Sequence, residues 1–338
     1  MASKKQASVV NVAIMGATGA VGKELLKILA QRKFPIGELR LLASKRSVGK
    51  KLKFKNKFYT VQELKTNSFE GIDIVLSSAG GSLSKKFVPY AVKAGAVVVD
   101  NTSAYRMDPK VPLVVPEINA AEIKKHKGII ANPNCSTIIM LLPLWPIDKQ
   151  NKIKKISVAT YQAASGAGAV AMQELEDQSK QVLSGKKAVK KVFPHQIAFN
   201  VFSHNSPICA NGFNEEELKM VHETHKIFKR KNIQIDVTCV RVPVYRAHSE
   251  AIFIELTKPM TPAKARSLIK AASGIQIVDD VKQNYFPMPL EADGGDDVLV
   301  GRIRQGLDSK KSLGMFISGD QIRKGAALNA VQIAEYLV

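Results

Sequence analysis

The sequence contains few cysteines. Cys135, Cys209 and Cys239 are its three cysteines among 338 residues, and no two of them form a C-x-x-C pair. Three cysteines cannot all pair with one another, so a disulfide framework is excluded, and their spacing supports no cysteine zinc site. We therefore expect a protein of the reducing cytoplasm that binds no metal.

Long hydrophobic runs are also missing. The longest candidate, Ile138–Ile147, contains two prolines and is about half as long as a membrane-spanning helix, which needs about 20 residues. Met1–Gln6, ahead of the first apolar segment, are too few for a signal peptide or an ordinary transit peptide. We expect no membrane association.

Acidic residues are outnumbered, with 29 Asp and Glu against 50 Lys and Arg and a net charge of +21. This excess favours anionic partners: nucleic acid, a membrane surface or phosphorylated small molecules. The basic patches carry no series of aromatic side chains on which bases could stack, so solvated surfaces are the favoured interpretation and nucleic-acid binding the alternative. The patches are Lys50–Lys57, Lys124–Lys127, Lys152–Lys155, Lys186–Lys191 and Lys226–Lys231.

The first 130 residues alternate apolar runs of strand length with helical patterns. At about 150 residues per domain the length predicts two domains, and this alternation predicts that the first contains a Rossmann-type, doubly wound parallel sheet. The expected strands are Val9–Met15, Leu39–Ala43, Ile72–Ser77 and Ala96–Asp100, and the expected helices are Val21–Arg32 and Ser82–Ala94.

After residue 135 the rhythm changes to longer strands and helices, which predicts an α+β domain. The expected strands are Lys155–Tyr161, Gln234–Val244 and Glu250–Leu256, and the expected helices are Val170–Leu183 and Glu215–Arg230. We place the first domain at residues 1–134 and the second at 135–317. A C-terminal segment at about 318–338, with helical spacing from Gly325 onward, completes the first domain.

A glycine-rich turn joins the first strand to the first helix. It reads Gly16-Ala17-Thr18-Gly19-Ala20-Val21-Gly22. Glycines allow the backbone to approach a pyrophosphate, and the helix N-terminus offers free N–H groups to it. The pattern is G-x-x-G-x-x-G rather than G-x-G-x-x-G, so it indicates a dinucleotide site mainly through its strand–turn–helix context, and a tight turn without a ligand is the alternative.

The loop after the second strand indicates which dinucleotide is bound. NAD sites usually carry an acid there for the ribose 2′-hydroxyl. Here Ser44-Lys45-Arg46-Ser47 supplies two cations and two hydroxyls, which suit a 2′-phosphate and favour NADP. Exposed loop residues without a ligand are the alternative.

Cys135 follows Asn132-Pro133-Asn134 and precedes an apolar helix. Pro133 and Asn134 are loop and cap residues, which puts Cys135 in the first helical turn. Helix N-termini favour the thiolate, and a thiolate can attack an activated acyl group. A small buried residue is the alternative, and packing is the favoured interpretation for Cys209 and Cys239.

Taken together, these motifs and others in the same order resemble aspartate-semialdehyde dehydrogenases over nearly the whole chain. The further motifs are Asn101–Arg106, Val115–Asn119, Asn132–Thr137, Gln162–Gly168, Asn214–Met220, Val240–Pro243, Arg246–Glu250 and Arg323–Asn329. The resemblance implies NADPH-dependent reduction of L-aspartyl 4-phosphate to L-aspartate 4-semialdehyde, with release of phosphate, in lysine (diaminopimelate), threonine and methionine biosynthesis. It also implies a homodimer or homotetramer formed through the second domain.

The resemblance assigns roles by position. It implies that Cys135 forms a thioester, that His248 is the acid/base and that Gln162 positions the acyl group. It implies substrate contacts for Arg106, Asn134, Glu216, Lys219 and Arg241, with Arg241 on the α-carboxylate, Glu216 on the ammonium, and Arg106 and Lys219 on phosphate. It implies cofactor contacts for Gly16, Thr18, Gly19, Ala20, Val21, Gly22, Ser44, Arg46, Ser47, Ser165, Gly166 and Gln321. Gln321 stands where the family usually has Asn. Because the side-chain amide is kept, we expect a similar but shifted cofactor contact there.

Without the resemblance, several of these residues have ordinary explanations. Glu216 and Lys219 are three apart on a predicted helix, which is common for a surface ion pair. We expect both to lie away from that helix's apolar stripe, formed by Leu218, Val221, His225 and Phe228. His222 and His225 lack an obvious third metal ligand, and His126, His195 and His204 give no functional signal.

Other enzymes remain as alternatives. N-acetylglutamyl-phosphate reductase and malonyl-CoA reductase are neighbours in reaction type. Glu216 and Arg241 together favour a zwitterionic substrate, because an acetylated one would leave Glu216 without its counter-charge. An inactive paralogue is opposed by the presence of Cys135, Gln162, Arg241 and His248.

Overall fold

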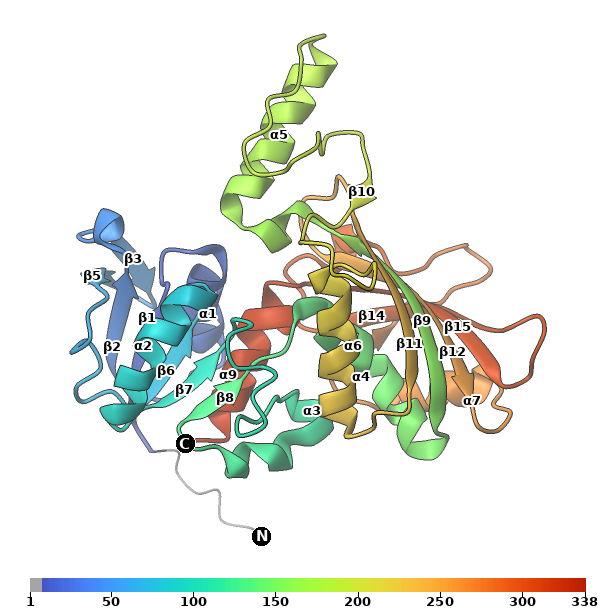
Figure 1. Cartoon of the computed structure of the whole chain (residues 1–338), viewed down its shortest axis with the longest axis horizontal. Coiled ribbons are helices and arrows are strands. Elements are labelled where there is room, and N and C mark those ends of the chain that lie inside the picture. The colour runs from blue at the N-terminus through green and yellow to red at the C-terminus, as the bar shows by residue number, and fades with distance from the viewer. Residues whose placement is uncertain (1–7) are drawn as a thin grey trace. The chain divides into compact units, whose positions relative to one another are not determined.

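The computed structural model describes residues 8–338. The chain divides into two compact units, one running up to Pro133 and including Ala326–Val338, and the other comprising Asn134–Gly325 (Figure 1). Each unit has its own sheet. Within the described part of the chain, no helix is long and apolar enough to cross a membrane.

The first unit is built on a parallel sheet of six strands in the order β5-β2-β1-β6-β7-β8. This confirms the doubly wound sheet predicted from the sequence. Its strands are β1 (Val10–Met15), β2 (Ile36–Ala43), β5 (Gln62–Glu63), β6 (Ile74–Ser77), β7 (Val97–Asp100) and β8 (Ile129–Ala131), and its helices include α1 (Ala20–Gln31), α2 (Gly81–Lys93) and α3 (Pro116–Asn119).

Both faces of this sheet are covered, because alternate residues of β1 enter different cores. Val12 and Ile14 pack in a cluster with residues of α1, whereas Ala13 and Met15 pack in a cluster with residues of α2. A parallel strand buried on both sides needs apolar residues at every position. This requirement explains the apolar run Val12–Met15 within β1.

The end of the chain returns to the first unit. Helix α9 (Leu328–Glu335) supplies Leu328, Val331 and Ile333 to the core that also contains α1. The expected return at residue 318 is wrong by eight residues. Strand β15 (Ser312–Gly319) pairs with two strands of the second sheet, so the return begins only at Ala326.

The second unit contains a mixed sheet of seven strands in the order β10-β11-β9-β12-β15-β14-β13. This confirms the predicted α+β architecture. Besides β15, its strands are β9 (Ile153–Gln162), β10 (Phe202–Ser203), β11 (Gln234–Arg241), β12 (His248–Leu256), β13 (Ile275–Ile277) and β14 (Val298–Gln305). Its helices are α4 (Cys135–Gln150), α5 (Ala169–Leu183), α6 (Glu215–Phe228), α7 (Pro262–Lys270) and α8 (Pro289–Ala292).

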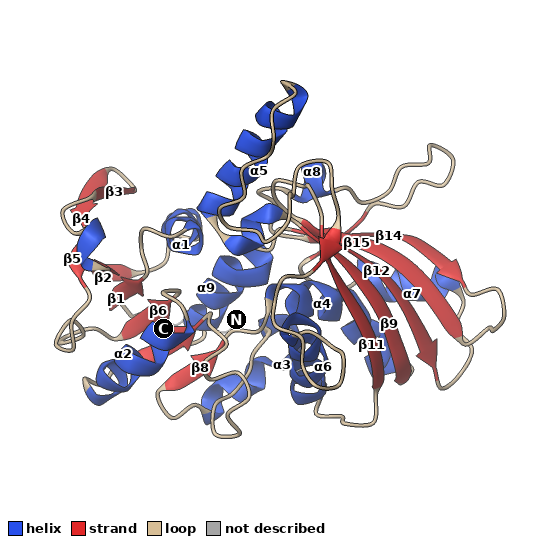
Figure 2. Cartoon of the chain, turned by 45° about the horizontal axis from the view of Figure 1, so that its top comes forward, coloured by secondary structure: helices blue, strands red, loops and turns tan. Residues whose placement is uncertain are grey.

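Helices cover one face of the central strands of this sheet. Figure 2 shows α4 and α6 beside β9 and β11, with which they are in contact. Side chains on the opposite face are open to solvent in the single chain, including Tyr161 and Phe253, which are 39% and 46% exposed. One face of the sheet, which carries the polar side chains that are candidates for catalysis, is therefore covered by α4 and α6. The other face is uncovered.

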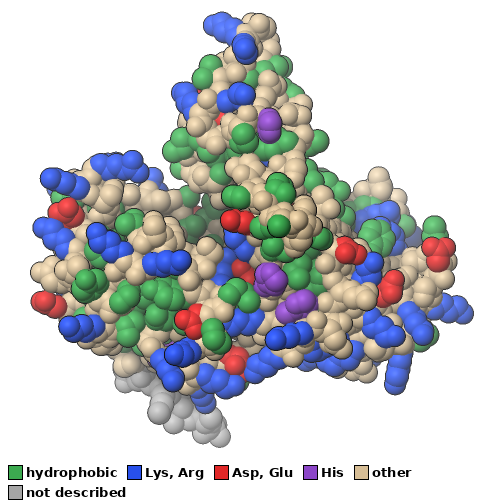
Figure 3. Space-filling view, in the orientation of Figure 1, with side chains coloured by type: hydrophobic (Ala, Val, Ile, Leu, Met, Phe, Trp, Pro, Cys, Tyr) green, Lys and Arg blue, Asp and Glu red, His purple; other side chains and the backbone are tan. Residues whose placement is uncertain are grey.

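The basic charge is distributed rather than concentrated. Over the face shown in Figure 3, Lys and Arg side chains lie in many separate groups with Asp and Glu side chains between some of them. Part of this charge lies on the hairpin formed by β3 (Lys51–Phe54) and β4 (Lys57–Thr60), whose lysines are exposed. Phe54, within the hairpin, is buried in the first unit's core.

Candidate active site

Three neighbouring strands of the second unit bring Arg241, Gln162 and His248 to one row. Arg241 on β11 lies opposite Gln162 on β9, and His248 is one residue beyond the Ser249–Tyr161 pair that joins β12 to β9. All three side chains are at least 97% buried. The sheet therefore places an amide, a guanidinium and an imidazole side by side beneath the helices.

Cys135 begins α4, as the sequence predicts. Asn134 is the N-cap, and its Oδ1 accepts hydrogen bonds from the N–H groups of Ser136 and Thr137 over 3.0 and 3.3 Å. The half-buried Cys135 is thus held where helical N–H dipoles favour a thiolate. None of the three cysteines is in a disulfide.

Gly325 packs against this cysteine. A Cβ atom at Gly325 would lie 2.8 Å from Cys135 Cβ and 3.2 Å from Cys135 Cα. Such a separation is too short for two carbon atoms, so any larger residue would displace the thiol. The absent side chain at Gly325 is therefore part of what places the sulfur.

Glu216 gathers several polar groups at the start of α6. Its Oε1 accepts hydrogen bonds from Asn134 Nδ2 at 2.8 Å and Gln162 Nε2 at 3.1 Å, and its Oε2 accepts one from Lys219 Nζ at 3.1 Å. Burial opposes ionisation of this carboxyl, but the electrostatic effects of Lys219 and His204 and the hydrogen bonds from Asn134 and Lys219 outweigh it and lower its pKa to about 2. The group is a buried carboxylate.

The position of Glu216 corrects one expectation. We expected Leu218, Val221, His225 and Phe228 to form the apolar stripe of this helix, with Glu216 and Lys219 away from it. Instead Glu216 is 6% exposed, and Leu218, Val221 and His225 are only partly buried. The buried face is formed by Glu216, Glu217, Met220, Glu223, Thr224, Ile227 and Phe228.

Arg241 is fixed on three sides. Its Nη1 donates to the carbonyl of Ala163 at 2.9 Å, its Nη2 lies 2.7 Å from Nε2 of His204, and its guanidinium lies 5.4 Å from the ring centre of Phe193. Its Nε has no hydrogen-bond partner in the described part of the chain. A buried cation with a donor to spare is suited to receive an anionic group.

His248 is held as a neutral ring. The N–H of Ala163 donates to its Nδ1 at 3.0 Å, so the single proton of the neutral imidazole lies on Nε2. Burial and then the charge of Arg241 lower the pKa of His248 to about 3. Nε2 finds no partner among residues 8–338, and a Cβ at Gly166 would lie 3.2 Å from it. Because Gly166 has no side chain, space remains next to Nε2.

Glu250, two residues beyond His248 on β12, is completely buried, and both of its carboxyl oxygens lack a hydrogen-bond partner in the described residues. Burial raises its pKa well above the usual value. Burial thus favours the protonated, neutral form of this carboxyl, which lies on the same strand as His248.

The glycine-rich turn of the first unit has the shape of a phosphate cradle. Gly16 has φ +91°, and a Cβ there would lie 2.6 Å from the carbonyl oxygen of Ser78. A Cβ at Gly22 would lie 2.3 Å from the carbonyl oxygen of Gly16. Only glycine fits either position. Helix α1 then starts behind Gly19, whose absent side chain leaves the first N–H groups uncapped, as a bound pyrophosphate requires.

The loop expected to hold the 2′-phosphate lies beside this turn. Ser44 precedes a short 3-10 turn at Lys45–Ser47, and Ser47 Oγ is 3.4 Å from Thr18 Oγ1. Lys45 and Arg46 are exposed. The two cations and the glycine-rich turn therefore belong to one surface of the first unit and fit a phosphorylated dinucleotide.

The predicted site residues fall into two groups, one in each unit. Arg106 belongs to the first unit, where its Nε donates to the carbonyl of Asn132 at 2.9 Å and its Nη2 to that of Asn101 at 2.8 Å. Ser165 and Gln321 belong to the second, where Gln321 Nε2 donates to Ser165 Oγ and Gln321 Oε1 accepts from the N–H of Ala247 at 2.9 Å. The first group is Gly16, Thr18, Gly19, Ala20, Val21, Gly22, Ser44, Arg46, Ser47 and Arg106, and the second is Asn134, Cys135, Gln162, Ser165, Gly166, Glu216, Lys219, Arg241, His248 and Gln321.

Sequence reasoning missed His204 and Ala163, both of which contact predicted site residues. No local pattern marks them. Ala163 acts through its backbone, and His204 follows the very short strand β10, so only the folded chain brings it to Arg241.

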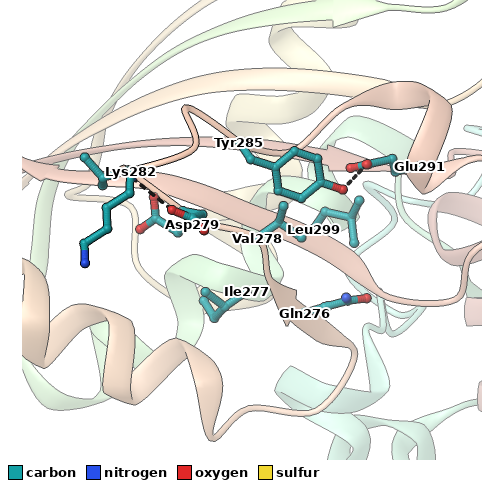
Figure 4. A pocket seen from close by; sticks show the side chains of 10 residues that line it. Gln276, Ile277, Val278, Asp279, Lys282, Tyr285, Glu291 and Leu299 are labelled. Carbon is teal, nitrogen blue, oxygen red and sulfur yellow. Dashed lines mark hydrogen bonds between the residues drawn. The ribbon is translucent and has the colours of Figure 1, made fainter.

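A cavity of about 810 Å³ elsewhere in the second unit contains none of these residues (Figure 4). It lies between β13, β14 and the segment that follows β13. Tyr285 donates to Glu291 there, and Asp279 pairs with Arg266 and accepts from the N–H of Arg302. Tyr285, Glu291 and Asp279 of this cavity thus have hydrogen-bond partners, and the cavity is separate from the site residues predicted from the sequence.

Comparison with known proteins gives a consistent result for both units. Residues 11–126 match the family model of the semialdehyde dehydrogenase NAD binding domain, and residues 144–324 match that of the semialdehyde dehydrogenase dimerisation domain. The chain is 56% identical to an aspartate-semialdehyde dehydrogenase of Synechocystis over 98% of both chains. It is 47% identical to one of Bacillus subtilis over 97% of both.

Solved structures give the same result. The chain is similar to aspartate semialdehyde dehydrogenase II of Vibrio cholerae complexed with ASA, with a TM-score of 0.95 and 44% identity over 98% of both chains. It is also similar to aspartate semialdehyde dehydrogenase of Candida albicans with NADP, with a TM-score of 0.75 and 25% identity over 98% of both.

Proposed function

The chain belongs to the aspartate-semialdehyde dehydrogenase family, and we propose that it reduces L-aspartyl 4-phosphate to L-aspartate 4-semialdehyde and phosphate through a thioester on Cys135. The observation that carries the mechanism is the position of Cys135 at the capped start of α4, within the same unit as a buried imidazole, an amide and a carboxylate–guanidinium pair.

An acyl phosphate is a reactive electrophile with a good leaving group. The sulfur of Cys135 attacks the acyl carbon, a C–S bond forms, the C–O bond to phosphate breaks, and phosphate leaves. Nicotinamide, when bound, supplies the hydride that reduces the resulting acyl group. The C–S bond then breaks and returns the thiolate as the aldehyde leaves. Covalent capture divides one difficult step into easier ones.

We assign the acid/base role to His248, which presents an N–H at Nε2, since Nδ1 accepts from the N–H of Ala163. A donor at this atom stabilises the negative charge that develops on the acyl oxygen in each tetrahedral intermediate. Gln162, whose Nε2 also donates to Ser136 Oγ at 3.1 Å, positions the acyl group. We assign binding of the leaving phosphate to Lys219 and Arg106.

Substrate recognition rests on two buried charges. Arg241 binds the α-carboxylate, because its planar fork can donate to both oxygens. Glu216 binds the α-ammonium, and its low pKa keeps it ionised for this purpose. A substrate whose amine is acetylated would leave the buried Glu216 carboxylate without that counter-charge, which disfavours N-acetylglutamyl-phosphate reductase as the activity.

We assign NADP as the cofactor. Gly16, Gly19 and Gly22 admit the pyrophosphate, and Thr18, Ala20 and Val21 complete the turn. Ser44, Arg46 and Ser47 bind the 2′-phosphate. Ser165, Gly166 and Gln321 contact the nicotinamide end. The cation-rich loop and the absence of an acid in Ser44–Ser47 support NADP over NAD.

We also infer that two copies of the chain associate through the uncovered face of the second sheet, where Tyr161, Phe253 and Phe316 lie. The rings of Tyr161 and Phe316 pack against each other there in a tilted arrangement, with 6.1 Å between their centres. A homotetramer would need a second contact. We place the enzyme in the cytoplasm, in lysine, threonine and methionine biosynthesis.

One experiment tests the activity and its neighbours together. The reverse reaction is followed as NADPH absorbance with NADP and, in turn, aspartate semialdehyde and phosphate, N-acetylglutamate semialdehyde and phosphate, or malonate semialdehyde and CoA. We expect turnover with the first alone, and preference for either of the other aldehydes would refute the assignment. Mass spectrometry of protein trapped with aldehyde and NADP should then locate the adduct on Cys135.

A further inference from the structure

We propose that His204 is a positioning residue for substrate binding, which fixes the guanidinium of Arg241 and, through Ser206, links it to Glu216. The inference rests on the proposed function, in which Arg241 binds the α-carboxylate and Glu216 the α-ammonium. It adds a connection between the two groups that recognise opposite ends of one zwitterion.

The contact between His204 and Arg241 determines the proton positions. A guanidinium can only donate, so His204 Nε2, 2.7 Å from Arg241 Nη2, accepts. The single proton of the neutral ring then lies on Nδ1, which is 3.1 Å from Ser206 Oγ. The N–H of Ser206 also lies 3.2 Å from Nδ1, but the shorter, charge-assisted contact at Nε2 decides the tautomer.

Ser206 carries the connection to α6. Its Oγ accepts a hydrogen bond from the N–H of Glu216 at 3.1 Å. The same oxygen can accept from Nδ1 of His204, because a hydroxyl has two lone pairs. A continuous series of hydrogen bonds thus runs from Arg241 through His204 and Ser206 to the first turn of α6.

The backbone holds His204 in place. Phe202 and Ser203 form β10, which pairs antiparallel with the end of β11, and Phe202 lies opposite Arg241. The N–H of His204 then donates to the carbonyl of Cys239 at 2.8 Å. The imidazole is therefore attached to the strand that carries Arg241 and needs little rearrangement to meet it.

The surroundings keep His204 able to accept. Burial lowers its pKa to about 4; Glu216 opposes the shift, while the charges of Arg241 and Lys219 add to it. A protonated ring would have no lone pair for the guanidinium and would place two cations together. At neutral pH the ring is neutral and the link is intact.

The proposed function of His204 is to restrict rotation of the Arg241 guanidinium. Without His204, Nη2 loses this acceptor, and the guanidinium can rotate about its contact with Ala163. The substrate carboxylate would then encounter the guanidinium of Arg241 in several orientations rather than in one. We therefore expect weaker binding of the amino-acid aldehyde and unchanged binding of phosphate and NADP.

The test compares side chains that differ in reach. In His204→Gln, the amide oxygen can occupy the place of Nε2, whereas in His204→Asn it is one carbon too short. We expect His204→Asn and His204→Ala to raise KM for aspartate semialdehyde about tenfold, with KM for phosphate and NADP changed by less than about twofold. His204→Gln should stay within about threefold of the parent. His222→Ala, at an exposed histidine of α6, is the control and should change nothing.

Two results would overturn the proposal. Equal KM values for the parent, His204→Asn and His204→Gln would show that Arg241 needs no such support. A parallel rise in all three KM values, not reversed by Gln, would show a general packing role. Failure of the parent protein to turn over aspartate semialdehyde would instead refute the proposed function, so the two failures are distinguishable.

Discussion

The backbone N–H of Ala163 donates to Nδ1 of His248 over 3.0 Å, which fixes the proton of this imidazole on Nε2. The carbonyl of the same residue accepts from Arg241 Nη1 at 2.9 Å. One residue between β9 and the following turn thus orients both the imidazole to which we assign proton transfer and the guanidinium to which we assign carboxylate binding. Because these contacts come from the main chain, they do not depend on the side chain at position 163.

Replacement of the nucleophile gives the first prediction. Cys135→Ala should lower turnover at least about a thousandfold, the order of loss that follows removal of a nucleophile. NADPH binding, measured by fluorescence titration, should be unchanged, because the glycine-rich turn lies in the other unit. Turnover near that of the parent would refute the covalent route.

The basic loop of the first unit gives the second prediction. Arg46→Asp should weaken NADPH binding by about 10- to 100-fold, since a hydrogen bond to a charged group contributes about 1.5–3 kcal/mol. NADH binding should change by less than about threefold, because NADH lacks the 2′-phosphate. Lys127→Asp makes the same charge change at another exposed residue of this unit and serves as the control. Equal losses for both nucleotides would remove Arg46 from this role.

The third prediction concerns the shape of the buried cation. Arg241→Lys keeps the charge but replaces a planar fork by a point charge. We expect KM for aspartate semialdehyde to rise at least about tenfold, the equivalent of one lost charged hydrogen bond, while KM for phosphate stays the same. Steady-state kinetics in the reverse direction measure both values. An unchanged KM for the aldehyde would mean that the α-carboxylate binds elsewhere.

The fourth prediction follows from the neutral acid on β12. Glu250 stays protonated in the folded protein because burial raises its pKa, but it ionises above about pH 4.5 when unfolded. The unfolded state therefore binds fewer protons, and the free energy of unfolding falls by about 1.4 kcal/mol for each pH unit above 4.5, up to the folded pKa.

Glu250→Gln should remove this decline, so the variant gains stability relative to the parent as the pH rises from 5 to 8. Urea unfolding at several pH values measures the difference. Glu70→Gln alters an exposed carboxyl of the first unit and should leave the slope as it is. Parallel slopes for the parent and Glu250→Gln would show that Glu250 is ionised in the folded protein.

Local patterns predicted the parts of the site that local structure forms. The start of α4 depends on Asn134, and its capping bonds join residues two and three positions apart. The glycine-rich turn likewise follows β1 directly. These features form through contacts between residues that are close together in the sequence, so a local sequence pattern is sufficient to predict them.

The buried face of α6 could not be predicted in this way. Glu223 accepts from the N–H of Asn134 at 2.6 Å, and Glu217 accepts from the N–H of Cys239 at 2.9 Å. These donors lie far away in sequence and make burial of the acids favourable. A prediction from helical periodicity treats acidic residues as solvent-exposed. For this reason it placed the buried stripe of α6 at Leu218 and Val221.

The return of α9 to the first unit has a consequence for biosynthesis. Residues up to Pro133 leave the ribosome first, yet their core stays incomplete until Leu328, Val331 and Ile333 have been translated. A premature stop codon near the 3′ end of the message would therefore damage the earliest part of the product.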